Sequence, residues 1–291
     1  MTLPIDRVVS ALASAFGRPV RIDSRAPLRG GMINEVEIVR TDVGTFVLKS
    51  HPTGPAAMFR AEAEGLEALQ KSGTTLAIPR VIHVDAGSPP FILLEFLDGA
   101  ARVSGFEDAL GRGLAQVHRA TAPRFGFAEG NFCGATPQPN PWTDRWVDFY
   151  GAWRIGHQLA LAADAGRVSE SDVRLIERLI MRLGDWIDEP PAPSLIHGDL
   201  WSGNLHADSA GRPALLDPAA YYAHREAELG MMTLFGGFPA RVFAAYDEAF
   251  PLEPGWQERQ PLYQLYHLMN HLNLFGGGYH AQVMAIVRRF A

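Results

Sequence analysis

Two acids and one amide lie close together in the C-terminal half of the sequence, at Asp199, Asn204 and Asp217. They lie on or beside two short apolar strands that we expect at 194–197 and 213–217, flanking a polar turn. A carboxylate can accept a proton, and carboxylate and amide oxygens are the ligands that a hard cation such as Mg²⁺ prefers. The pattern therefore predicts a site with a general base and a divalent cation. The alternative is a loop in which these residues only cap turns.

The spacing of these residues matches the catalytic loop of protein kinases. That loop has the sequence His-x-Asp with an asparagine five residues after the aspartate, as in His197, Asp199 and Asn204. Asp217 stands where the second metal ligand is expected. A kinase also needs a lysine on a strand of its first lobe to hold the nucleotide phosphates, and Lys49 ends the strand TFVLK.

Lysine is rare in this chain. Of the 26 lysines and arginines, only Lys49 and Lys71 are lysines. The two cations are not interchangeable at a crowded phosphate site, so a compact ammonium at Lys49 favours the kinase interpretation over an exposed lysine at a strand end. Such a lysine needs an acidic partner on a helix, although each helix acid alone is more typical of a solvated face. The candidate partners are Glu62, Glu64 and Glu67.

Other motifs with a chemical mechanism are weak or absent. Gly30 and Gly31, followed by Asn34, form a turn among the first expected strands, where backbone amides could cover phosphates. Neither G-x-G-x-x-G nor the Gly-Lys pair of a Walker A loop occurs, and no G-x-S-x-G elbow is present. His267 and His271 are four residues apart, but no Glu follows His267 as a metalloprotease requires, so we interpret them as a core or lining pair.

Composition limits the class of protein. A chain of 291 residues with 47% hydrophobic and 20% charged residues has room for two folded lobes. The net charge of −6 argues against nucleic acid as a partner. Cys133 is the only cysteine, which excludes an internal disulfide and fits a reducing compartment. The start does not read as a signal peptide and no continuous apolar 18-mer occurs, so we expect a cytoplasmic protein that does not span a membrane.

The element pattern predicts an α+β fold whose first part is rich in strands. Its expected elements are a helix at 5–16, a hairpin at 35–49, a helix at 56–71 and strands at 80–84 and 91–94. Long helical patterns then follow at 106–120, 142–165 and 169–187. We therefore expect an N-terminal lobe of residues 1–97 and a C-terminal lobe of residues 98–291.

Several longer segments resemble one known family. They are GGMINEV at 30–36, FVLK at 46–49, MFRAEAEGLEAL at 58–69, TPQPNPWTDRWVDFY at 136–150, HGDLWSGN at 197–204, DPAAYYAHRE at 217–226, LFGGFP at 234–239 and YQLYHLMNHLNLFGGGY at 263–279. The chain is similar in these segments to the fructosamine kinases (ketosamine 3-kinases), relatives of the aminoglycoside phosphotransferases. The resemblance covers nearly the whole chain, and HGDLWSGN and NLFGGGY are its most specific segments.

The resemblance implies a protein-kinase-like fold with a small β-rich N-lobe, one key helix in that lobe, and a larger, mainly helical C-lobe. It makes Asp199 the proton acceptor for a sugar hydroxyl, and Asn204 and Asp217 the metal ligands. It also implies that Lys49 pairs with Glu62 and contacts the phosphates of ATP. The remaining implied contacts are adenine at the hinge residues Leu94, Glu95 and Phe96, and the sugar at Trp201.

Two positions depart from the wider kinase pattern. Pro218 and Ala219 follow Asp217 in place of Phe-Gly, so activation by phosphorylation of a loop is not implied. Glu228 stands where the wider superfamily often has an Asp that braces the catalytic loop, which leaves its bracing role open. The implied activity is Mg²⁺-dependent and ATP-dependent phosphorylation of the C3 hydroxyl of a free or protein-bound ketosamine. The alternatives are a kinase of another small hydroxylated amine, such as an aminoglycoside or a choline-like compound, and a catalytically inactive nucleotide-binding regulator.

Overall fold

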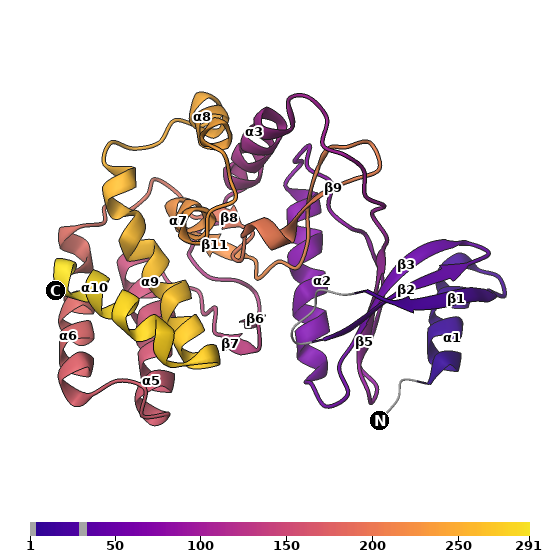
Figure 1. Ribbon diagram of the computed structural model, residues 1–291, viewed down its shortest axis with the longest axis horizontal. Helices are drawn as coiled ribbons and strands as arrows, with labels where there is room; N and C mark the ends of the chain where they lie inside the picture. The colour runs from indigo at the N-terminus through magenta and orange to yellow at the C-terminus, as the bar shows by residue number, and fades with distance from the viewer. Residues whose placement is uncertain (1–3, 29–33) are drawn as a thin grey trace.

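The computed structural model describes residues 4–28 and 34–291, which fold into a small β-rich lobe and a larger helical lobe (Figure 1). Gly30 and Gly31 lie outside the described residues. The elements of the small lobe are α1 (Ile5–Phe16), β1 (Ile22–Pro27), β2 (Glu35–Thr41), β3 (Gly44–Ser50), α2 (Ala56–Lys71), β4 (Val81–Asp85) and β5 (Phe91–Glu95). The large lobe begins with α3 (Phe106–Arg119). We propose that the lobes divide between residues 97 and 98, in the segment that joins β5 to α3.

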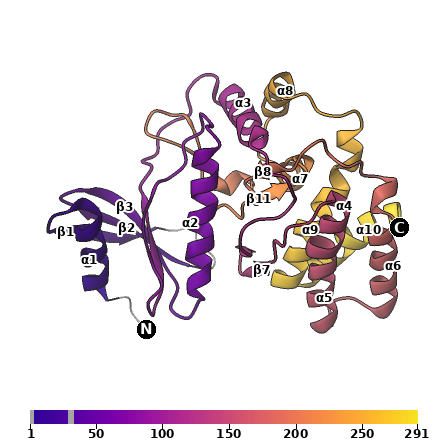
Figure 2. The ribbon, with the colours of Figure 1, turned by 180° about the vertical axis from the view of Figure 1, so that it is seen from behind.

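The small lobe is built on a five-stranded antiparallel sheet with the order β1-β2-β3-β5-β4. Successive side chains on a strand point to opposite faces. On β3, Phe46 and Leu48 pack into the core beneath α1, whereas Val47 and Lys49 point to the other face, where α2 lies. In both views α2 lies between the sheet and the large lobe (Figures 1 and 2). The sheet therefore presents one face, with Lys49 on it, towards the large lobe.

The large lobe is mainly helical. After α3 its helices are α4 (Trp146–Phe149), a π-helical segment (Tyr150–Gly156), α5 (His157–Asp164), α6 (Glu170–Met181), α7 (Glu226–Leu234), α8 (Ala240–Ala249), α9 (Trp256–Phe275) and α10 (His280–Phe290). Its short strands are β6 (Asn131–Cys133), β7 (Thr136–Gln138), β8 (Ser194–Ile196), β9 (Leu205–Ala207), β10 (Pro213–Leu215) and β11 (Tyr221–Ala223). No helix in the described part of the chain has both the length and the apolar character that crossing a bilayer requires.

The helix α2 and the segment after it are attached to the large lobe. Gly65 on α2 faces Pro218 and Ala220, and a Cβ at Gly65 would lie 3.3 Å from the Pro218 ring. Beyond the helix, the Ala77 N–H donates to the Pro213 carbonyl and the Ala77 carbonyl accepts from the Leu215 N–H, both at 2.9 Å. The main chain after α2 thus extends the β9–β10 ribbon of the other lobe.

The strands expected at 194–197 and 213–217 are present as β8 and β10, but they do not pair with each other. β8 pairs with β11, and β10 pairs with β9, so Asn204 and Asp217 belong to loops between two separate ribbons. The partner strands have only three residues each, too few for a periodic pattern to reveal. The helix expected at 142–165 begins at Trp146 and changes to π-helical geometry at Tyr150.

The crossing of α3 and α8 yields a stability prediction. A Cβ at Gly111 of α3 would lie 2.4 Å from the Val242 carbonyl oxygen and 2.8 Å from the Tyr246 amide nitrogen. We expect Gly111→Ala to lower the free energy of unfolding by about 1–3 kcal/mol, because the backbones must move apart. The control Gly184→Ala, with no atom within 4 Å of the added Cβ, should change it by less than about 0.5 kcal/mol. Urea unfolding measures both changes. If Gly111→Ala lowered the free energy of unfolding no more than Gly184→Ala does, the crossing of α3 and α8 would tolerate a methyl group and the prediction would be wrong.

Candidate active site

The ammonium of Lys49 lies where the two lobes meet. Glu62 is three residues after Phe59 and four residues before Leu66 on α2, and both apolar residues are fully buried, so Glu62 lies on the same buried face. Lys49 Nζ donates to Glu62 Oε1 at 2.6 Å, and both side chains are largely buried. Glu67, another candidate partner, instead pairs with Lys71 on the exposed side of the helix. The predicted pairing of Lys49 with Glu62 is therefore present.

Asp217 of the large lobe contacts the same ammonium. Lys49 Nζ donates to Asp217 Oδ1, while 56% of the Asp217 side chain remains exposed on the open side of the site. Asp217 has a φ of +56°, a left-handed conformation that is uncommon for non-glycine residues and is adopted most readily by Asp and Asn. Burial alone would lower the pKa of Lys49, but the carboxylates of Glu62 and Asp217 outweigh it and raise the pKa above its ordinary value. The lysine is thus a permanent cation held between the lobes.

Backbone hydrogen bonds join the segment 197–204 to the residues on both sides of Asp217. The Ala219 N–H donates to the His197 carbonyl at 2.9 Å, and the Leu216 N–H donates to the Asn204 carbonyl at 3.0 Å. Gly198 makes the approach possible, because it has a φ of +83° and a Cβ there would lie only 2.2 Å from the Ala219 carbonyl oxygen. The loops that carry the two aspartates are therefore joined directly to each other.

Glu228 contacts the backbone of the loop that carries Asp199. Its fully buried carboxylate accepts hydrogen bonds from the backbone N–H groups of His197 and Gly198, the latter at 3.1 Å. His118 of α3 lies 3.7 Å from the same carboxylate and shares a 2.7 Å hydrogen bond with the Tyr246 hydroxyl of α8. The glutamate therefore supplies the bracing that the sequence left open, and the buried imidazole of His118 links it to the crossing of α3 and α8.

Asp199 lies in an unusual electrostatic environment. Burial, followed by the negative charges of Glu228 and Asp217, raises the pKa of Asp199 to about 8. Asn204 Nδ2 donates to the Asp199 carbonyl at 2.8 Å and approaches its Oδ2 at 3.4 Å. Within residues 4–28 and 34–291, no hydrogen bond reaches the other oxygen, Oδ1. The Asp199 carboxyl group is thus more basic than an ordinary aspartate, and one of its oxygens has no hydrogen-bond partner among the described residues.

The remaining predicted residues lie in the small lobe and in the segment after β8. Leu94 and Glu95 end β5 and Phe96 follows them, with the Glu95 N–H donating to the Arg80 carbonyl at 2.8 Å. Trp201 lies over Gly203, where a Cβ would be 2.2 Å from the indole ring, and 42% of the tryptophan is exposed. Asn34 immediately precedes β2.

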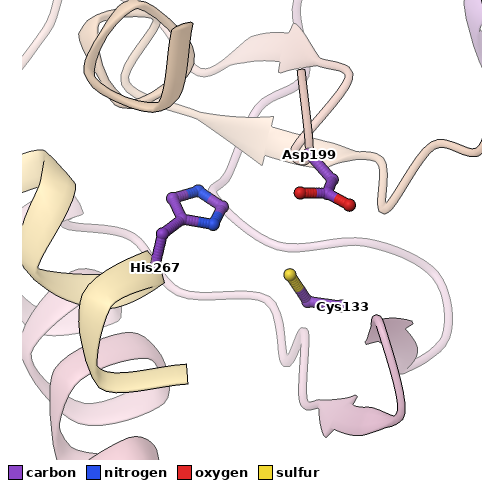
Figure 3. A group of neighbouring side chains, drawn as sticks. All are labelled: Cys133, Asp199 and His267. Atoms are coloured by element: carbon purple, nitrogen blue, oxygen red, sulfur yellow. The ribbon is translucent and has the colours of Figure 1, made fainter. Parts of the chain in front are cut away.

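Two residues near Asp199 were not predicted from the sequence to belong to this site. Cys133, at the end of β6, and His267, on α9, are both buried. Their ligand atoms and a carboxylate oxygen of Asp199 all lie within 4.8 Å of one another, and the three side chains turn towards one space (Figure 3). No spacing pattern connects positions 133, 199 and 267, so the sequence contains no signal for this cluster.

The fold and the site together define a phosphotransferase of the protein-kinase-like type. The fold is shared with an aminoglycoside phosphotransferase solved with AMP-PNP and hygromycin B, with a TM-score of 0.64 and 17% identity over 97% of this chain and 98% of that one. The family described as fructosamine kinase matches residues 4–291. The chain belongs to that family.

Individual relatives agree with this membership. A Synechocystis sp. protein provisionally named as a ketoamine kinase is 39% identical over 289 residues, which cover 98% of this chain and 96% of the relative. The chloroplastic protein-ribulosamine 3-kinase of Arabidopsis thaliana is 39% identical over 281 residues, which cover 93% of this chain and 83% of the relative. A crystal structure of a provisionally named fructosamine-3-kinase from Thermobifida fusca YX-ER1 has a TM-score of 0.86 and 32% identity, covering 98% of each chain.

The environment of Asp199 yields a pH prediction. A proton acceptor works only when deprotonated, so activity should rise as the pH increases through the pKa of Asp199. Glu228→Gln removes a negative charge that raises this pKa, so we expect the acidic limb of kcat/KM for the acceptor to move to lower pH. The change also replaces one backbone acceptor by a donor, which should lower the free energy of unfolding by about 1–3 kcal/mol. If Glu228→Gln folds and the acidic limb of its kcat/KM profile does not move, the charge of Glu228 does not raise the pKa of Asp199 and the prediction is contradicted.

Proposed function

We propose that this protein is an ATP-dependent kinase that phosphorylates the C3 hydroxyl of ketosamines, the adducts of a sugar with an amine. The observation that supports it most strongly is the meeting of the Lys49 ammonium with Glu62 and Asp217 beside Asp199. Phosphoryl transfer depends on positioning and charge neutralisation, and this arrangement supplies both. The family and the named relatives support the same reaction class and substrate class.

The nucleotide is proposed to lie between the lobes. Lys49, fixed by Glu62, contacts the phosphates, and the main chain of the segment from Leu94 to Phe96 meets adenine. Because the Glu95 N–H is already donated to Arg80, we assign the adenine contact to the backbone of Phe96. The turn containing Gly30, Gly31 and Asn34 is proposed to cover the phosphates with its amides.

The residues proposed as metal ligands fit Mg²⁺. Asn204 uses its Nδ2 to hold Asp199, and no described residue donates to its Oδ1, which leaves an amide oxygen for a metal. Asp217 offers a half-exposed carboxylate beside it. Oxygen ligands of this kind suit a hard cation that keeps several waters. When bound, Mg²⁺ would neutralise charge on the transferred phosphoryl group.

Asp199 is the proposed proton acceptor. Its carboxylate takes the proton from the C3 hydroxyl as the hydroxyl oxygen forms its bond to the γ-phosphorus, and the bond from that phosphorus to ADP breaks. The exposed face of Trp201 offers an apolar surface on which a sugar can pack. A phosphate on C3, next to the C2 carbonyl, leaves more readily after enolisation than hydroxide does. The product therefore decomposes and frees the amine, which makes deglycation the proposed role.

The two lysines allow a matched test of the nucleotide site. We expect Lys49→Met to lower kcat/KM for ATP by about 10²- to 10³-fold, because it removes a fixed positive charge from the phosphates. Lys71→Met removes the other lysine from an exposed helix face and should leave the rate within about twofold. Steady-state kinetics at saturating acceptor measure both. Equal losses of kcat/KM in the two variants, or no loss in either, would argue against a contact between Lys49 and the phosphates of ATP.

The acceptor is tested by product analysis. We expect phosphorus NMR to show a phosphate ester at C3 after reaction of ATP with ribulose-lysine or fructose-lysine. Asp199→Asn should reduce turnover by about 10²- to 10⁴-fold while ATP still binds, because it removes the base and not the nucleotide contacts. Turnover of an aminoglycoside or a choline-like compound, without turnover of either ketosamine, would reverse the assignment. Absence of Mg²⁺-dependent ATP consumption with every acceptor would indicate an inactive regulator.

A further inference from the structure

The cluster of Cys133, Asp199 and His267 brings together three kinds of metal-binding group from three elements of the large lobe (Figure 3). Cys133 ends β6, Asp199 follows β8 and His267 lies on α9. The phosphoryl-transfer chemistry proposed above gives no role to the thiol or to the imidazole. Their position beside the proton acceptor therefore calls for its own explanation.

The imidazole of His267 is buried and has an unused nitrogen. Only 4% of the residue is exposed, and its Nδ1 has no hydrogen-bond partner in the part of the chain that the structure describes. A buried nitrogen without a partner costs free energy unless another group meets it. The Oδ1 of Asp199 is likewise not reached by a hydrogen bond from any described residue. A cation bound by the imidazole of His267 and the carboxylate of Asp199 would give both groups a partner.

We infer that Zn²⁺ binds between Cys133, Asp199 and His267 and thereby inhibits the kinase. Zinc takes thiolate, imidazole and carboxylate ligands in tetrahedral geometry, with water free to fill the fourth position. Ligand atoms around one zinc ion lie about 3.3–3.6 Å apart, given metal–ligand distances of about 2.0–2.3 Å. The three atoms here, within 4.8 Å of one another, need only a modest side-chain movement to reach it.

The ligand set separates this site from the proposed Mg²⁺ site. A thiolate and an imidazole favour zinc, whereas Asn204 and Asp217 offer only oxygens, which favour magnesium. Binding releases the thiol proton to solvent, together with the proton of Asp199 where that carboxyl is protonated. The ion with its thiolate and carboxylate ligands is then neutral as a unit, beside the buried Arg154 whose cation already acts on His267.

Neighbouring side chains hold two of the ligands in place. Asn270 Nδ2, one turn along α9 from His267, donates to the Cys133 carbonyl at 3.2 Å. Asn204 holds the Asp199 backbone in the same way. Such outer contacts orient metal ligands. Because zinc would engage the carboxylate that accepts the proton, it should compete with the sugar and not with the nucleotide.

Cobalt spectroscopy tests the site without depending on enzyme activity. Cys133 is the only cysteine in the chain, so a thiolate-to-Co²⁺ absorption band in tag-free protein can come from no other residue. We expect Co²⁺ to give this band and tetrahedral d–d bands with one equivalent bound, and Zn²⁺ to displace it. Cys133→Ser should abolish the thiolate band, and His267→Gln should weaken binding by at least about tenfold. The matched control His271→Gln, one turn away on α9, should retain both the band and the affinity.

Inhibition kinetics test whether zinc bound at this site inhibits the kinase. At fixed Mg²⁺ and ATP, Zn²⁺ should inhibit competitively with the ketosamine, and Cys133→Ser, checked for folding by thermal unfolding, should raise the inhibition constant at least about tenfold. Absence of the thiolate band in the wild-type protein would overturn the site. Equal inhibition of the wild type and Cys133→Ser would overturn the inhibitory role. If no acceptor is turned over, the proposed function fails, while the cobalt experiment still decides the metal site.

Discussion

A buried ammonium with a carboxylate on either side is the interaction on which the rest of this structure depends. Burying Lys49 unpaired would be strongly unfavourable, so the small lobe must bring Glu62 to it and the large lobe must bring Asp217. This pairing depends on the register of β3, on the face that α2 presents and on the approach of the large lobe to the small lobe. It also explains why the chain keeps a lysine here, although it uses arginine almost everywhere else.

The sequence predicted those parts of the fold whose patterns are long enough to read. The sequence predicted most elements of the small lobe close to where they occur, namely α1, α2, the β2–β3 hairpin, β4 and β5. In each of them the hydrophobic residues recur with a clear helical or strand period. The fold class was also correct. Among the three-residue strands of the large lobe, β8 and β10 were expected, whereas their partners β11 and β9 were missed, since nothing in the sequence of β9 or β11 distinguishes a strand from a loop.

The site, like the fold, could be predicted from the sequence only in part. The resemblance placed Lys49 and Glu62 together, and helical spacing alone could have done so, because Glu62 shares a face with the buried Phe59 and Leu66. Contacts that depend on tertiary packing were not predictable. The support of the catalytic loop by Glu228, and the positions of Cys133 and His267 beside Asp199, follow from how α9, β6 and α7 pack, which no local pattern records.

The attachment of α2 to the large lobe has a consequence for control. In many protein kinases the equivalent helix swings outwards and breaks its ion pair with the lysine, which switches the enzyme off. Here the close fit of Gly65 against Pro218 holds the middle of α2, and the two hydrogen bonds of Ala77 to the β9–β10 ribbon hold the chain that follows the helix. Control of this enzyme is therefore expected to act through what occupies its site and not through an outward swing of α2.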